Sequence, residues 1–240
     1  MDQVRSHKTE FWLTIFLSLG ASSIWSVISL LRKLQATGGL AASTTTINRP
    51  MAETPWLDLM SQLVSIGLAL IPVFLALYFL RQDQIRFSLL PNPKDLVQIV
   101  LVAAAIGIPG IGLYFLALNL GLTSAVVPSA LNDNWWTVPI LLLAAAKAGL
   151  LEEVVVVGFF SEKLRLINPR ISVWVVVLLS ALFRASYHLY QGYSAFIGNF
   201  VMGLVFALWY QRTKRVAPLI ATHFLMDATV FVGYPLVFGS

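Results

Sequence analysis

Long apolar stretches separated by short polar connectors are the dominant pattern along this 240-residue chain. A helix needs about 20 consecutive apolar residues to cross a bilayer, and seven windows of about that length occur. They cover residues 11–31, 57–80, 96–118, 137–160, 171–190, 194–211 and 217–237. The pattern predicts an all-α, polytopic transmembrane helix bundle with about seven spans.

The connectors between these windows carry turn formers, such as the Pro and Asn residues at 91–93. The segment 36–50 is rich in Gly, Ser and Thr and has no periodicity, which predicts a mobile loop. We find neither an internal repeat nor a boundary between domains. The chain is therefore expected to form a single membrane-embedded domain over residues 1–240.

The composition fits a protein whose main solvent is lipid. Hydrophobic residues make up 58% of the chain and charged residues 11%, and the mean hydropathy is +0.80, whereas a soluble domain carries about 25% charged residues. The formal charge is +5, but the basic residues lie in short clusters between apolar windows, so we expect no nucleic-acid partner. Because cysteine is absent, thiolate nucleophiles and thiolate metal sites are excluded, and a nucleophile must be oxygen or activated water.

Lysine and arginine orient the bundle, because cytoplasmic connectors carry an excess of both. If the amino terminus is cytoplasmic, the outside connectors hold three basic residues, Arg32, Lys33 and Arg49. The inside connectors then hold Arg5, Lys8, Arg81, Arg86, Lys94, Lys163, Arg165, Arg170, Arg212, Lys214 and Arg215. This predicts a multi-pass protein of a cell membrane, expected to be a bacterial cytoplasmic membrane, with its carboxyl terminus outside. The first window is too long for a cleavable signal and is expected to remain as an anchor.

Two adjacent glutamates, Glu152 and Glu153, lie inside the apolar window 137–160. An ionisable side chain at the bilayer centre costs about 2.5–3.5 kcal/mol on insertion scales, so the pair indicates a functional site. The alternative is a structural pair held by a neighbouring cation or amide. Adjacent helical residues point about 100° apart, so the two carboxylates are expected to have different tasks. The small residues at 144–149 predict the close approach of another helix.

Later windows add His188 and the pair His223 and Asp227. His188 follows Arg184 by four residues and Asp227 follows His223 by four, so each pair is expected on one helix face. Taken singly, a position at the membrane interface explains His188, and a hydrogen bond to a neighbouring helix explains His223. Imidazoles with carboxylates are together the ligand set of zinc, and Asp227 would bind the metal or orient His223.

The order and spacing of three stretches, residues 152–157, 184–188 and 223–227, resemble the signature of a known family. This is the CAAX protease and bacteriocin-processing family (CPBP, also called Abi), which includes the type II CAAX prenyl endopeptidases. Its signature is Glu-Glu-x-x-x-Arg, then Phe-x-x-x-His, then His-x-x-x-Asn or Asp, on successive helices. The resemblance covers a catalytic core of about residues 137–237.

The resemblance implies an intramembrane endopeptidase that hydrolyses a peptide bond of a membrane-associated protein or peptide. It implies that Glu152 and His188 activate water, while His223 and Asp227 stabilise the oxyanion or complete a metal site. A metalloprotease and a metal-free glutamate mechanism both remain open. In the first of these, Glu152, His188 and His223 would bind a zinc ion.

Two positions depart from the signature, because Val157 replaces the arginine and Arg184 replaces the phenylalanine. One hypothesis is a swap in which Arg184 holds Glu153 and leaves Glu152 free for water, since an unpaired buried arginine is very costly. The alternative places Arg184 at the interface or in an aqueous cavity. The missing arginine also leaves open a catalytically inactive immunity or adaptor protein. A proton-coupled transporter is a further alternative, although the repeats and interrupted helices of transporters are not found.

Straight, parallel helices would keep the two histidines apart. His188 is late in an outward span and His223 is early in another, a difference of roughly eleven residues or about 16 Å along a helix. Convergence therefore requires offset helices or non-helical backbone around a cavity.

Overall fold

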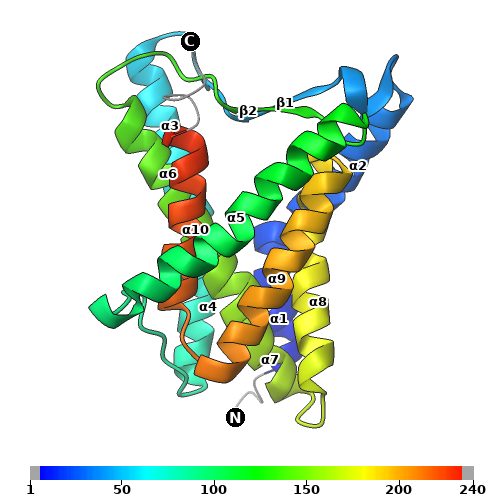
Figure 1. The fold of residues 1–240 in the computed structure, drawn as a ribbon. Helices are drawn as coiled ribbons and strands as arrows, with labels where there is room; N and C mark the ends of the chain where they lie inside the picture. Colours follow the sequence, from blue (N-terminus) through cyan, green and yellow to red (C-terminus); the bar gives the residue numbers. More distant parts are fainter. Residues whose placement is uncertain (1–5, 234–240) are drawn as a thin grey trace.

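The computed structural model describes residues 6–233, and the main feature of this part of the chain is a bundle of seven helical rods (Figure 1). Three rods come from single helices, α8 (Val173–Ser186), α9 (Tyr193–Thr213) and α10 (Ala217–Ala228), the last continued by the π-helix Thr229–Gly233. Each of the other four rods joins consecutive elements. The first runs through α1 (His7–Ile15), the π-helix Phe16–Gly20 and α2 (Ala21–Gln35), and the second through α3 (Pro55–Ala69) and α4 (Ile71–Gln82). The third joins the 3₁₀ turn Pro93–Asp95 to α5 (Leu96–Asn119), and the fourth runs through α6 (Thr137–Leu151), the π-helix Glu152–Phe159 and α7 (Phe160–Ile167).

The predicted all-α helix bundle is confirmed. Four rods in the described part of the chain are long and apolar enough to cross a membrane, and α8 and α10 are shorter apolar helices. The rod from α6 to α7 carries the charges predicted inside the membrane. Residues 234–237 of the last predicted window, and Arg5 of the predicted inside cluster, lie outside the described residues.

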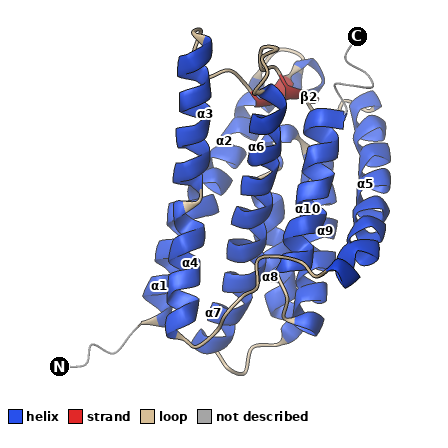
Figure 2. Ribbon diagram, turned by 90° about the vertical axis from the view of Figure 1, so that its left-hand side faces the viewer, coloured by secondary structure: helices blue, strands red, loops and turns tan. Residues whose placement is uncertain are grey.

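The rod from α6 to α7 forms the centre of the bundle. It packs against α1, α3, α4, α8, α9 and α10, and the side chains of residues 154–157 are fully buried. The helix α5 lies against α9 and α10 and is mostly exposed (Figure 2). A group attached to the middle of the central rod is therefore surrounded by other helices.

A two-stranded parallel sheet joins two connectors at one end of the bundle (Figure 1). Its strands are β1 (Thr44–Asn48) and β2 (Ala125–Ser129), with Thr44 opposite Ala125. The expectation of a mobile loop over residues 36–50 is therefore wrong for residues 44–48. The hydropathy pattern gave no sign of this pairing, because the two strands are about 80 residues apart and rich in threonine or interrupted by proline.

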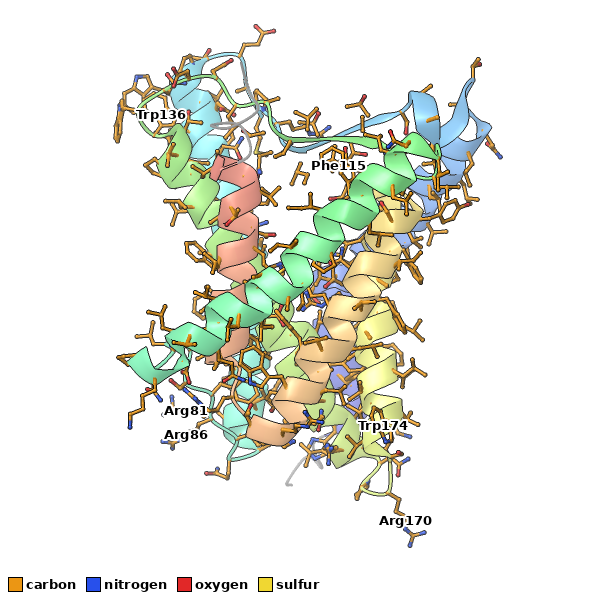
Figure 3. The ribbon with its side chains drawn as sticks, in the orientation of Figure 1. Arg81, Arg86, Phe115, Trp136, Arg170 and Trp174 are labelled. Carbon is orange, nitrogen blue, oxygen red and sulfur yellow. The ribbon has the colours of Figure 1, made fainter. Side chains whose placement is uncertain are left out.

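Several basic residues lie at the opposite end from the sheet, whereas Lys33 lies beside strand β1. Figure 3 shows Arg81, Arg86 and Arg170 at this end, and Trp136 at the end that carries the strands. We call these the basic end and the strand end. This separation is the one that the positive-inside rule uses, although the orientation relative to the cytoplasm stays a prediction.

Candidate active site

The two intramembrane glutamates lie at the middle of the central rod, where its backbone changes from α-helix to π-helix. The 15 residues of α6 precede Glu152, and Glu152 and Glu153 begin the eight-residue π-helix. Turns of π-helix are rare and are frequently found at functional sites. Glu152 is 8% exposed and Glu153 is fully buried, so both carboxylates need partners from the protein.

Arg184, near the end of α8, contacts both carboxylates. Its Nη2 atom donates to Glu153 Oε1 over 2.5 Å, and its Nη1 atom donates to Glu152 Oε2 over 3.2 Å. The guanidinium is fully buried and lies 5.5 Å from the centre of the Phe206 ring on α9. The predicted ion pair with Glu153 is therefore present, whereas Glu152 is not free of the guanidinium as the swap hypothesis expected.

A glycine allows α9 to cover this arginine closely. A Cβ atom added to Gly203 would lie 2.8 Å from Ala181 Cα and 3.3 Å from Arg184 Cδ. Small residues at such crossings let two helices approach more closely than larger side chains permit. The contact between α8 and α9 therefore fixes the depth and direction of the arginine.

Glu152 has two further neighbours, one of which the sequence did not indicate. Tyr187 Oη donates to Glu152 Oε2 over 2.8 Å, and His188 Nε2 lies 3.7 Å from the same oxygen. The other oxygen, Oε1, makes no hydrogen bond to any described residue, and the Glu152 side chain is 10% exposed. Tyr187 was missed because one tyrosine near a helix end is an ordinary interfacial residue.

Glu153 has a different set of neighbours. His223 Nδ1 lies 2.7 Å from Glu153 Oε1, and His223 Nε2 lies 3.5 Å from Asp227 Oδ2. The predicted contact between His223 and Asp227 is therefore present. A Cβ atom on Gly149 would lie 2.9 Å from Ile220 O, which shows the close approach of α10 predicted from the small residues of α6.

The turn after α8 differs from the prediction. We expected a span over residues 171–190 with Arg184 and His188 on one helix face, but α8 ends at Ser186. His188 lies in the turn before the 3₁₀ helix Leu189–Gln191. The expected pairing through one helix face is thus wrong, and the two residues meet through Glu152.

His188 and His223 are not kept apart as straight, parallel helices would keep them, because α10 begins inside the bundle and not at its end. Val216, Ala217 and Leu219 are at most 1% exposed, so the helix begins among other side chains. In Figure 1 the lower end of α10 lies above the lower end of α9. Together with the short α8, this offset brings His188 and His223 to the two glutamates.

The exposed edge of the cluster faces the strand end. On the side of the basic end, residues 154–157 are fully buried and close the cluster. On the other side the side chains of His188 and Asp227 are 17% and 24% exposed.

The zinc site predicted from Glu152, His188 and His223 stays a prediction. Among residues 6–233, the His and acidic side chains whose ligand atoms all lie within 4.8 Å of one another are His7, Glu10 and Asp83, at the basic end. There, the buried Lys163 ammonium donates to Glu10 and, over 2.5 Å, to Asp83. Glu152, His188 and His223 form no such group in the described part of the chain. The permanent cation between the two glutamates is Arg184, and we derive no step through a metal.

A model of a known protein family matches the part of the chain that holds this cluster. Residues 134–229 match the family described as type II CAAX prenyl endopeptidase Rce1-like. No curated protein and no solved structure matches the chain significantly. The match includes both glutamates, Arg184, both histidines of the cluster and Asp227. The part of the chain that holds the cluster is therefore similar to the Rce1-like type II CAAX prenyl endopeptidases, and this match supports the resemblance seen in the sequence.

Proposed function

We propose that this membrane protein is an endopeptidase that hydrolyses a peptide bond of a membrane-associated protein or peptide, with Glu152 as the base that activates water. The observation that carries the proposal is the buried cluster in which Glu152, Glu153 and Arg184 meet His188 and His223 from three rods. Burial of so many charged groups is expensive and is expected at a functional site. The family match supports the same reaction class.

Glu152 is the better placed of the two carboxylates for proton transfer. Its Oε2 atom is held by Tyr187 and Arg184, while Oε1 has no hydrogen-bond partner among the described residues. In the proposed step, Oε1 takes a proton from water as the water oxygen bonds to the carbonyl carbon. The same proton then passes to the amide nitrogen as the C–N bond breaks. A positioned general base of this kind contributes about 10²–10⁴-fold to the rate.

His188 is the imidazole proposed to face the reacting groups. Neither of its ring nitrogens has a hydrogen-bond partner among the described residues, and Nε2 is 3.7 Å from Glu152 Oε2. In contrast, both nitrogens of His223 face carboxylates, those of Glu153 and Asp227. We therefore assign contact with water or the oxyanion to His188, where a fixed donor stabilises developing charge. His223 and Asp227 then position Glu153.

Arg184 provides positive charge beside both carboxylates, and Glu153 holds it in place. The arginine that the family signature places at position 157 is replaced here by a fully buried valine. Because a guanidinium reaches the glutamates from α8 instead, the loss at position 157 does not itself favour an inactive adaptor.

The test of the base is Glu152→Gln in proteoliposomes with a fluorogenic prenylated CAAX peptide and its unprenylated counterpart. We expect the variant to lose at least about 10²-fold in kcat while its abundance and melting temperature stay close to the wild type, since the amide keeps the size of the side chain. Glu53→Gln, which removes an exposed carboxylate, is the control. Wild-type turnover by Glu152→Gln would refute the assignment.

Chelation tests the metal-free form of the proposal. Because Arg184 lies at the carboxylates where a cation is needed, we expect dialysis against a strong zinc chelator to leave kcat within twofold. Elemental analysis of purified protein should give far less than one zinc per chain. Stoichiometric zinc, with activity lost on chelation and restored by added zinc, would instead establish a metalloprotease.

A further inference from the structure

The position of the His188 ring depends on the backbone that carries it. Its two nitrogens have no hydrogen-bond partner among the described residues, and its nearest ring neighbour is the adjacent Tyr187 at 4.8 Å. Side-chain hydrogen bonds therefore do not fix the ring. The backbone turn over residues 186–192, between α8 and α9, must place it beside Glu152.

The helix α2 holds one side of this turn. Ser186 Oγ donates to Ser23 Oγ over 2.9 Å, Tyr190 N donates to Ser26 Oγ over 2.7 Å, and Lys33 Nζ donates to Tyr190 O over 2.6 Å. Ser23, Ser26 and Lys33 are spaced three and seven residues apart, so they lie along one face of the helix. We call these three residues the polar ridge of α2.

Lys33 also joins the turn to the strand pair. Its ammonium donates to Thr45 Oγ1 over 2.5 Å and to Ser124 Oγ over 2.9 Å, in addition to Tyr190 O. A lysine has three N–H donors, so this group is fully satisfied by three neutral oxygens. Such a set of partners holds one geometry, because the loss of any of them leaves a part-buried donor unpaired.

The segment before β2 holds the other side of the turn. Ser124 N and Thr123 Oγ1 each donate to Gln191 O over 2.9 Å. Gly192 has φ +119°, and a Cβ atom there would lie 2.6 Å from Thr123 Cα, so glycine is required for this approach. The turn therefore has partners on both sides.

We propose that Lys33 is a positioning residue of the active site, acting through the turn to keep His188 beside Glu152. The proposal rests on the proposed function in taking His188 as a group that meets the substrate. The turn is held by the polar ridge of α2 and by residues 123–124. Both lie outside residues 134–229, which the family model matches. The matched core thus carries the histidine, and residues that precede this core in the chain place it.

The chain offers a direct readout, because it contains three histidines. Proton–carbon spectra of detergent-solubilised protein with ¹³C-labelled histidine give one Cε1–H signal for each, and His188→Gln assigns the signal of interest. We expect Lys33→Met and Ser26→Ala to shift or broaden the His188 signal and to leave that of His223 in place. Arg32→Met, which removes the neighbouring exposed cation, should leave both unchanged.

Measurement of kcat and KM is the second test of the proposal. Misplacement of a catalytic group by about 1 Å can cost about 10²-fold, so Lys33→Met should lower kcat about 10- to 100-fold with KM within twofold. An unchanged His188 signal in Ser26→Ala and Lys33→Met would overturn the proposal, and Ser26→Ala decides alone if Lys33→Met does not fold. The spectra need no substrate, so a failure of the protease assignment would appear as absent turnover in the wild type and leave the test of positioning intact.

Discussion

Arg184 is fully buried and shared by Glu152 and Glu153, so its removal leaves two buried carboxylates without their permanent cation. Breaking a buried ion pair by removing one partner typically costs about 3–5 kcal/mol. We therefore expect Arg184→Leu to lower the free energy of unfolding by about that amount and to abolish turnover. Thermal unfolding in detergent measures the first effect, and Arg212→Leu, which removes an exposed arginine, is the control.

Adding Val157→Arg to Arg184→Leu should recover part of this loss. Position 157 follows Glu153 by four residues on the same rod, so an arginine there can reach Glu153 but would not replace the contact to Glu152. Coupled sites give non-additive effects of about 0.5–3 kcal/mol in a double-mutant cycle. Additive effects of the two substitutions would show that the two positions do not serve the same carboxylate.

At the scale of helices, Gly149 and Gly203 lie where two helices cross, and the close approach that each allows brings a charged side chain to the cluster. Gly149 lets α10 bring His223 to Glu153, and the added Cβ of Gly149→Ala would lie 2.9 Å from a backbone oxygen that cannot rotate away. Overpacking of this kind costs about 1–3 kcal/mol. We expect Gly149→Ala to lower the melting temperature and kcat together, because α10 must move away from the central rod.

Gly198→Ala on α9 is the matched control for this substitution. Nothing lies within 4 Å of a Cβ atom at Gly198, so the alanine should be neutral or stabilise the helix by about 0.5–1 kcal/mol. If both alanine variants behave alike, the contact between α6 and α10 does not set the position of His223.

The helices were predictable to different degrees. The rods follow from hydropathy, because bilayer thickness fixes the length of an apolar helix. The end of α8 at Ser186 could not be predicted, since Tyr187, Tyr190 and their neighbours are compatible with a continued helix and the contacts that break it come from α2 and residues 123–124. The deep start of α10 likewise depends on tertiary packing. The acids and histidines were found because charge inside a membrane is rare, whereas Tyr187 and Lys33 carry no such signal.

For the molecule as a whole, Arg81, Arg86 and Arg170 lie at the basic end and Trp136 lies at the strand end. If the basic end is cytoplasmic, the strand end lies on the outer side of the membrane. The absence of cysteine allows a direct test with single cysteines. We expect Asn132→Cys, near Trp136, to react with an impermeant maleimide in intact cells, and Gln82→Cys, beside Arg81, to react only after permeabilisation. The reverse pattern would place the strand end on the cytoplasmic side.

The ion pair between Glu153 and Arg184 also has a consequence for biosynthesis. The two residues are 31 positions apart, so at about 5–20 residues per second the ribosome makes the arginine about 2–6 s after the glutamate. During that interval the central rod would have to enter lipid with protonated acids or wait at the insertion machinery. If the central rod waits, the pair formed by the central rod and α8, and not either helix alone, is the unit that enters the membrane.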